Sequence, residues 1–186
     1  MRHLILQLDN AGQAIGWINW QDAVTFYAKD LVSWTIGENV FRFHGGCSRE
    51  TSHRSFVDVH SIIATRSVVK ANKFDIAPPL TNRALFRRDD HMCMYCLTTL
   101  PDRDLTRDHV VPVGQGGKNV WTNVVAACAR CNQHKACRTP QQAGMKLHAV
   151  PYTPNYAEWL VLRNRRILAD QMAFLKTQFS KRNRKQ

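Results

Sequence analysis

Two pairs of cysteines have the spacing of metal-binding turns. They are Cys93 with Cys96 and Cys128 with Cys131. Zinc binds thiolate sulfur in closed four-ligand sites, and two CxxC turns supply four such ligands with little strain. No secretory leader is apparent after Met1, so we expect reduced thiols rather than disulfides. The spacing therefore predicts one structural zinc ion per chain.

Three polar residues between and after these cysteines could carry out catalysis. Asp108 and His109 are adjacent in the segment between the two pairs, and Asn132 directly follows the last cysteine. Carboxylate and amide oxygens are hard ligands that suit Mg²⁺ or Mn²⁺. A histidine beside them can accept a proton from water near neutral pH. Together these groups fit metal-assisted hydrolysis of a phosphodiester bond.

The elements that position these residues are predicted from the flanking sequence. Short β-branched runs on either side of a glycine-rich turn favour two antiparallel strands, and Pro112 would end regular pairing after the Asp-His pair. Residues from about Val125 to Cys137 favour a helix. This helix would place Cys128 and Cys131 on one face and bring Asn132 back toward the first strand. The expected order is strand, strand, helix, bracketed by zinc.

This set of residues resembles the HNH endonucleases. The resemblance is strongest from about residue 85 to 145. It rests on Asp108-His109-x-x-Pro112, Gly116-Gly117, Asn123, Cys128-x-x-Cys131-Asn132 and Lys135.

The resemblance implies a ββα-metal nuclease core and a role for each matching residue. Asp108 and Asn132 would hold the catalytic Mg²⁺ or Mn²⁺, and His109 would be the general base. Asn123 would tie the loop together and help to orient that base. The resemblance further implies 5′-phosphate and 3′-hydroxyl ends, and a nucleic-acid substrate for which DNA is favoured.

The composition agrees with a polyanionic partner. The 186 residues include 26 Lys and Arg against 14 Asp and Glu, for a net charge of +12. Such a chain attracts nucleic acid, although charge alone does not separate DNA from RNA or from acidic protein. At 44% apolar residues it can bury one moderate core. No run approaches the roughly 20 apolar residues of a membrane span, so we expect a cytoplasmic protein without membrane contact. A homo-oligomer is left open but is not indicated.

Residues 1–77 are predicted to form an N-terminal α/β region that packs on the core. Asn19 can cap a helix that runs to about Val32. Residues 34–43 and 56–69 read as strands. The polar segment 44–55 between them is predicted to be a surface loop, which could touch phosphate or be merely solvated.

Residues 78–145 are predicted to be the nuclease domain. A Pro78-Pro79 break precedes Thr81, which can cap a short helix leading into the first cysteine pair. This helix would turn Leu85 and Phe86 inward. Its arginines at positions 83, 87 and 88 would face outward, either toward phosphate or toward solvent.

Residues 146–186 are predicted to form a basic C-terminal helix and tail. From Asn155 the apolar residues recur at helical spacing, and arginines and lysines occupy the remaining positions. One long helix would dock by its apolar stripe, and its basic side would face either phosphates or solvent. The nucleic-acid-binding candidates of the whole chain are Arg87, Arg88, Lys118, Lys135, Arg138, Arg163, Arg166, Lys181 and Arg182.

The sequence thus predicts an α+β protein with a zinc-bracketed ββα-metal core, and it leaves two functional classes open. The first is a metal-dependent HNH endonuclease. The second is a zinc-stabilised nucleic-acid-binding module that has the fold without catalysis. The presence of Asp108, His109 and Asn132 together favours the nuclease, because a module that had lost catalysis would be expected to lack at least one of them.

Overall fold

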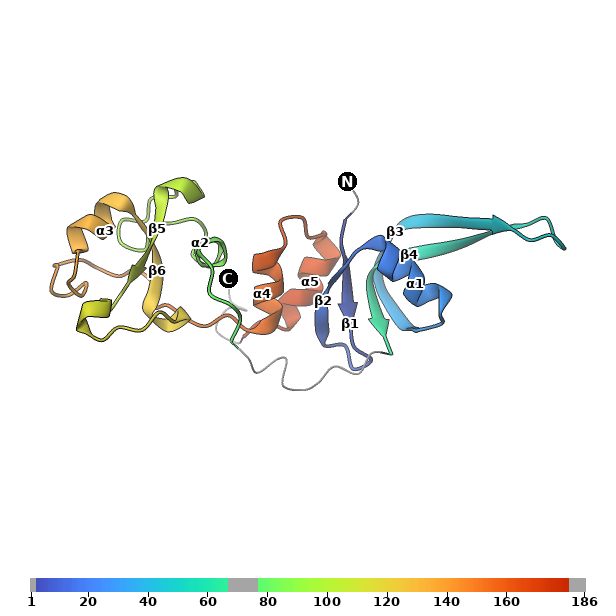
Figure 1. Cartoon of the computed structure of the whole chain (residues 1–186), viewed down its shortest axis with the longest axis horizontal. Coiled ribbons are helices and arrows are strands. Elements are labelled where there is room, and N and C mark those ends of the chain that lie inside the picture. The colour runs from blue at the N-terminus through green and yellow to red at the C-terminus, as the bar shows by residue number, and fades with distance from the viewer. Residues whose placement is uncertain (1–2, 67–76, 181–186) are drawn as a thin grey trace. The chain divides into compact units, whose positions relative to one another are not determined.

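The computed structural model describes residues 3–66 and 77–180, which form two compact units. The sheet unit comprises the described residues of 1–76 and 156–186, and the cysteine unit comprises Ala77–Asn155. Each unit combines helices with a small sheet, which confirms the expected α+β class (Figure 1). This division differs from the three predicted segments, because the C-terminal helices belong with the N-terminal sheet.

The sheet unit is built on four strands in the order β2-β1-β4-β3. Strand β1 (Ile5–Leu8) pairs antiparallel with β2 (Ala14–Ile18) and parallel with β4 (Arg54–Thr65). Strand β3 (Val32–Cys47) forms a long antiparallel hairpin with β4. Every residue of the interior strand β1 is buried, as expected for a strand covered on both faces.

Helices cover both faces of this sheet. Helix α1 (Trp20–Ala28) packs through Ala23 against the face that carries Ile5 and Ile63. Helices α4 (Tyr156–Arg163) and α5 (Ala169–Thr177) pack through Leu160 and Leu175 against the opposite face. The alternation of side chains along each strand produces these two separate apolar clusters. The helix cap predicted at Asn19 is confirmed, since its side chain accepts a hydrogen bond from Asp22 N at 2.8 Å.

The prediction of one long C-terminal helix is wrong. The helical pattern breaks after Arg163, and α5 begins only at Ala169. The side chain of Asn164 accepts a hydrogen bond from Arg166 N at 3.1 Å, an alternative to the helical bond of the kind asparagine offers. Two short helices can then both lay their apolar residues on the sheet.

The hairpin is longer than the sequence predicted. Strand β3 extends to Cys47 and β4 begins at Arg54, so half of the expected loop 44–55 lies in the two strands. On the outer face, Arg42 pairs with Asp58 at 2.7 Å and lies over the ring of Phe56. Cross-strand contacts of this kind stabilise the hairpin, although its outer part does not alternate between buried and exposed residues. Residues 67–69 of the predicted second strand lie outside the described residues.

The cysteine unit contains a short helix followed by a two-stranded sheet and a second helix. Thr81 caps the N-terminus of helix α2 (Asn82–Arg88). Its side chain accepts a hydrogen bond from Ala84 N, so the predicted cap is confirmed. Strand β5 (Leu105–His109) pairs antiparallel with β6 (Val124–Cys128), and helix α3 (Ala129–Lys135) follows. The helix predicted from about residue 125 starts later, because pairing with β5 holds 124–128 as strand.

Within the described part of the chain, every helix is too short or too polar to cross a lipid bilayer.

Candidate active site

The four paired cysteines come together at one point of the cysteine unit. Their sulfur atoms all lie within 4.8 Å of one another. A tetrahedral zinc ion with Zn–S bonds of about 2.3 Å needs sulfurs separated by about 3.8 Å, so this cluster fits zinc after a small contraction. Cys128 ends strand β6 and caps helix α3, and Cys131 lies one turn further along that helix. The strand-to-helix junction therefore presents one CxxC pair to the other.

The four thiols have different environments. Burial raises the pKa of Cys93 and of Cys131. Hydrogen bonding to Thr98 lowers the pKa of the exposed Cys96 to about 6; the two side chains are 3.3 Å apart. Since the thiolate is the metal ligand, the lowered pKa of Cys96 favours metal binding, and a metal ion would stabilise the thiolates of the buried Cys93 and the half-buried Cys131.

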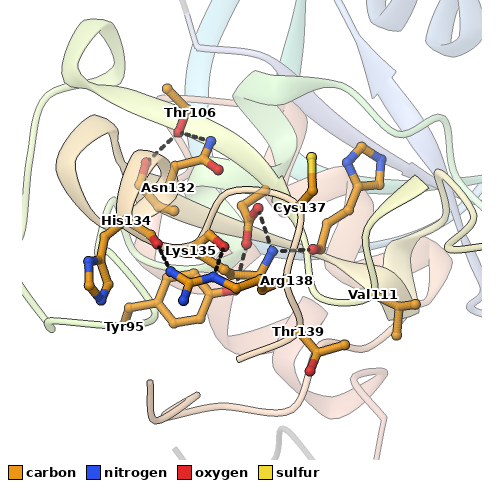
Figure 2. A network of polar contacts seen from close by, with 12 residues as sticks. Tyr95, Thr106, Val111, Asn132, His134, Lys135, Cys137, Arg138 and Thr139 are labelled. Atoms are coloured by element: carbon orange, nitrogen blue, oxygen red, sulfur yellow. Dashed lines mark hydrogen bonds and ion pairs between the residues drawn. The ribbon is translucent and has the colours of Figure 1, made fainter. Parts of the chain in front are cut away.

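Asp108 lies inside the unit, with both carboxylate oxygens hydrogen-bonded. Its Oδ2 accepts a hydrogen bond from the Tyr95 hydroxyl at 2.5 Å, and its Oδ1 accepts one from Lys135 Nζ at 3.0 Å. Only 5% of Asp108 is exposed. Burial, and after it the carboxylate of Asp108, raises the pKa of Tyr95, which keeps the phenol protonated as a donor. Figure 2 shows Tyr95 and Lys135 in this network.

His109 is the last residue of β5, and its side chain contacts an asparagine. His109 Nε2 lies 3.3 Å from Asn119 Oδ1, and Arg107 donates to the same oxygen at 3.0 Å. The bond from Arg107 turns the amide oxygen of Asn119 toward the histidine. Because a carbonyl oxygen can only accept, this contact favours the tautomer with hydrogen on Nε2 and leaves Nδ1 as the acceptor.

Asn123 holds the glycine-rich loop closed. Its side chain accepts a hydrogen bond from Val111 N and donates to Val111 O and Lys118 O, at 2.9 to 3.0 Å. A Cβ atom at Gly117 would lie 1.7 Å from Val111 O, so only glycine permits this close approach. These three side-chain bonds of Asn123 all go to backbone groups of the loop, and the residue that contacts the histidine is Asn119.

Asn132 faces strand β5 from the middle of helix α3. Its Nδ2 donates to Thr106 Oγ1 at 2.9 Å, and the Thr106 hydroxyl donates in turn to Ala127 O (Figure 2). Thr106 and Asp108 are two residues apart in the strand, so they share a face. The bond from Nδ2 fixes the orientation of the amide and leaves the Oδ1 oxygen of Asn132 available as a ligand.

Two of the predicted nucleic-acid contacts are buried, which corrects the prediction. Arg88 was expected to face outward, yet its guanidinium pairs with Asp89 at 2.8 Å and donates to the carbonyls of Trp121, Val124 and Tyr152. Lys135 is 1% exposed and bonds to Asp108 and to the carbonyl oxygen of His109 at 2.8 Å. Both cations bond to acceptors inside the unit. Carboxylates and carbonyls are costly to bury without such partners.

The other basic candidates that the structure describes remain accessible to differing degrees. Arg87 is half-buried, and the exposed candidates are Lys118, Arg138, Arg163 and Arg166. Arg138 donates to the carbonyls of His134 and Lys135 at the end of α3, and Arg163 lies over the ring of Trp159. Lys181 and Arg182 lie outside the described residues.

Sequence reasoning missed three residues around the predicted catalytic groups. Tyr95 contacts Asp108, Asn119 contacts His109, and Arg107 donates to Asn119. The position of Tyr95 inside the CxxC turn could have indicated its role. A residue in that turn lies close to the side chains that pack against the cysteine cluster. Asn119 carried no such signal, because only the folded loop shows that it, rather than Asn123, reaches the histidine.

Comparison with known proteins places this site in a family. Residues 93–148 match the HNH endonuclease family. The resemblance predicted from the sequence is thereby confirmed for this segment, which we call the HNH segment. It contains all four clustered cysteines together with Asp108, His109 and Asn132.

Two CRISPR-associated endonucleases of the Cas9 type are similar to part of the chain. The protein from Corynebacterium diphtheriae is 42% identical over 50 residues, which cover 26% of this chain. The protein from Actinomyces naeslundii is 38% identical over 61 residues, or 32% of this chain. Each match spans only 5% of the relative's length. The crystal structure of the Type II-C Cas9 enzyme from Actinomyces naeslundii aligns at 23% identity with a TM-score of 0.27, covering 53% of this chain and 14% of that one.

Proposed function

We propose that the chain is a metal-dependent HNH endonuclease that hydrolyses phosphodiester bonds in nucleic acid. The observation that carries this proposal is the family match, which falls on the segment where the structure gathers four cysteines beside Asp108, His109 and Asn132. DNA is the favoured substrate, and 5′-phosphate and 3′-hydroxyl ends are the expected products. The strand, strand, helix order of β5, β6 and α3 supports a ββα-metal core.

The four-cysteine cluster is the proposed structural zinc site. Four sulfur ligands close the coordination sphere, so this metal would have no open position for substrate. Its task would be to tie the turn 93–96 to the junction of β6 and α3, in addition to the apolar contacts of Met94 and Tyr95 with Val125 and Ala127. We therefore assign one zinc ion per chain to the fold and none to the reaction.

Asp108 and Asn132 are the proposed ligands of a catalytic Mg²⁺ or Mn²⁺. The donor set fits a hard cation, because among the described residues only the Nδ2 of Asn132 is engaged, and a carboxylate has lone pairs beyond the two that Tyr95 and Lys135 use. The ammonium of Lys135 forms an ion pair with this carboxylate. When bound, the divalent ion would supply electrostatic stabilisation of the negative charge that develops during hydrolysis.

His109 is the proposed general base. Asn119 binds its Nε2, so Nδ1 is the nitrogen that would accept the proton of the attacking water. Lys135 holds the backbone carbonyl of the same residue, which limits movement of the strand end. Both contacts come from the chain itself and would orient the imidazole before substrate arrives.

Basic side chains from both units are the proposed phosphate contacts. Lys118 lies in the loop that Asn123 closes, and Arg138 follows helix α3. Arg87 and the basic residues of the sheet unit, at positions 163 and 166, would add contacts to the nucleic-acid backbone, as would Lys181 and Arg182. These contacts position the substrate and do not read its sequence.

A cleavage assay with matched variants tests the proposal. Purified protein is incubated with supercoiled plasmid, single-stranded DNA or RNA in Mg²⁺, Mn²⁺ or EDTA. Cleavage should require the divalent metal and should be lost in Asp108→Ala and reduced in Asn132→Ala. Asp104→Ala is the control, because Asp104 is an exposed carboxylate in the turn before the same strand. Metal-independent cleavage, or full activity of Asp108→Ala, would contradict the assignment. Binding without cleavage in every metal would leave the nucleic-acid-binding module as the function.

A further inference from the structure

The side chain of Tyr95 bridges the cysteine cluster and the site of the proposed catalytic metal. Tyr95 is the third residue of the turn Cys93-Met94-Tyr95-Cys96, so two of the four clustered cysteines fix its backbone. Only 7% of the residue is exposed. Its hydroxyl lies 2.5 Å from Asp108 Oδ2, the shorter of the two side-chain hydrogen bonds that hold the carboxylate.

Core packing alone does not explain a hydroxyl at this position. The ring of Tyr95 belongs to an apolar cluster with Val125 and Ala127, and a phenylalanine ring would fill the same space. A buried hydroxyl is costly unless it is hydrogen-bonded, and the acceptor here is the carboxylate proposed to bind the metal. The hydroxyl therefore has a polar partner rather than a packing role.

Two donors on different oxygens define the plane of the carboxylate. Lys135 approaches Oδ1 from helix α3, and Tyr95 approaches Oδ2 from the cysteine turn. The torsion that rotates a carboxylate about its terminal bond is broad in energy, so one donor would leave the group free to swing. With both donors in place, the remaining lone pairs of Asp108 keep a constant direction.

We infer that Tyr95 is a positioning residue, which sets the orientation of the Asp108 carboxylate for the divalent metal and so connects the zinc site to the catalytic site. This inference rests on the proposed function, since it needs Asp108 to be a ligand. Outer partners of metal ligands commonly change metal affinity or activity by about 10- to 100-fold when they are removed. Tyr95 has this relation to Asp108.

Tyr95→Phe is the decisive variant, because it removes the hydroxyl and keeps the ring. We expect Mn²⁺ binding, measured by electron paramagnetic resonance titration in the absence of substrate, to weaken by about 10-fold or more. The metal concentration for half-maximal cleavage should rise by a similar factor, while the rate at saturating metal changes far less. Zinc content should stay at that of the parent chain.

The control is Tyr156→Phe, which removes a comparable hydrogen bond, to Ile15 O at 2.6 Å, in the sheet unit. It should leave Mn²⁺ binding and the metal dependence of cleavage unchanged. A purely structural role of the Tyr95 hydroxyl would lower thermal stability without moving either metal measurement, and this outcome would overturn the inference. So would unfolding or loss of zinc in Tyr95→Phe, because the hydroxyl would then serve the fold.

The outcomes separate this inference from the proposed function. If Asp108→Ala retains metal binding and cleavage, the assignment of Asp108 fails and the inference fails with it. If Asp108→Ala is inactive and Tyr95→Phe binds Mn²⁺ as the parent does, the function stands and only the positioning role is refuted.

Discussion

Different interactions stabilise the interior of each of the two units. The sheet unit buries apolar side chains on both faces of a four-stranded sheet under three helices. The cysteine unit has only a two-stranded sheet, and its buried residues include the charged groups Arg88, Asp108 and Lys135. A two-stranded sheet is marginally stable by itself. The comparison shows that the cysteine unit combines its smaller sheet with a cluster of four cysteines and with buried ion pairs, one of which contains Asp108 of the candidate site.

Removal of one cysteine should have the largest effect, and it should act on one unit alone. Structural zinc in small sites contributes on the order of 10 to 16 kcal/mol, so Cys128→Ser should unfold the cysteine unit and leave the sheet unit folded. Hydrogen exchange measures this directly: amides of β5 and β6 should lose protection, while those of β1 and β4 keep it. Metal analysis that finds no zinc in well-folded parent protein would refute the prediction.

Replacement of Arg88 should have the next largest effect. Arg88→Met leaves the carboxylate of Asp89 without its cation in a buried site, and breaking a buried pair typically costs 3–5 kcal/mol. Hydrogen exchange of the β6 amides under increasing denaturant measures the loss, since the carbonyl of Val124 in this strand accepts from Arg88. Arg83→Ala on the exposed side of the same helix is the control and should change stability by less than about 0.5 kcal/mol. Equal effects of the two variants would show that the buried pair is not a stabilising element.

Replacement of His109 should separate catalysis from stability within the cysteine unit. His109→Ala removes the proposed base and touches neither the cysteines nor the proposed metal ligands, so cleavage should fall by about 10²-fold or more with the fold retained. Rates under saturating metal and substrate, with a melting curve of each variant, provide the measurement. Full activity would move the base elsewhere, and exposed His134 would be the next residue to replace.

The smallest effect is expected at the end of the sheet unit. Replacing Lys181 and Arg182 by glutamine should weaken binding to duplex DNA without altering stability. The slope of log affinity against log salt concentration should shrink by roughly 0.9 for each lost phosphate contact. Truncation earlier in the chain is a poorer test, because Gln178 donates to Gly12 O and Ser180 binds Glu158. An unchanged slope would show that the two cations do not contact the backbone.

Some features of the chain could be predicted because they depend on short stretches of sequence. The cysteine pairs have a fixed spacing, and the caps at Asn19 and Thr81 need only one side chain and the next turn of backbone. The helix breaks were harder. After the interruption at Asn164, both short helices place apolar residues against the sheet, and the periodicity of apolar residues does not record where the helix stops.

The chemical groups at the candidate site follow from the sequence: four cysteines at metal-binding spacing, a carboxylate, an imidazole and an amide, in an order that resembles the HNH endonucleases. How the surrounding side chains are used follows from the tertiary structure. From the sequence, Arg88 and Lys135 are expected at the surface. In the structure both are buried and bonded to acceptors from distant positions in the chain. Tyr95 and Asn119 likewise become partners of Asp108 and His109 only when the chain folds. The physical reason is that a buried polar group needs a partner, and that partner is set by proximity in space rather than along the chain.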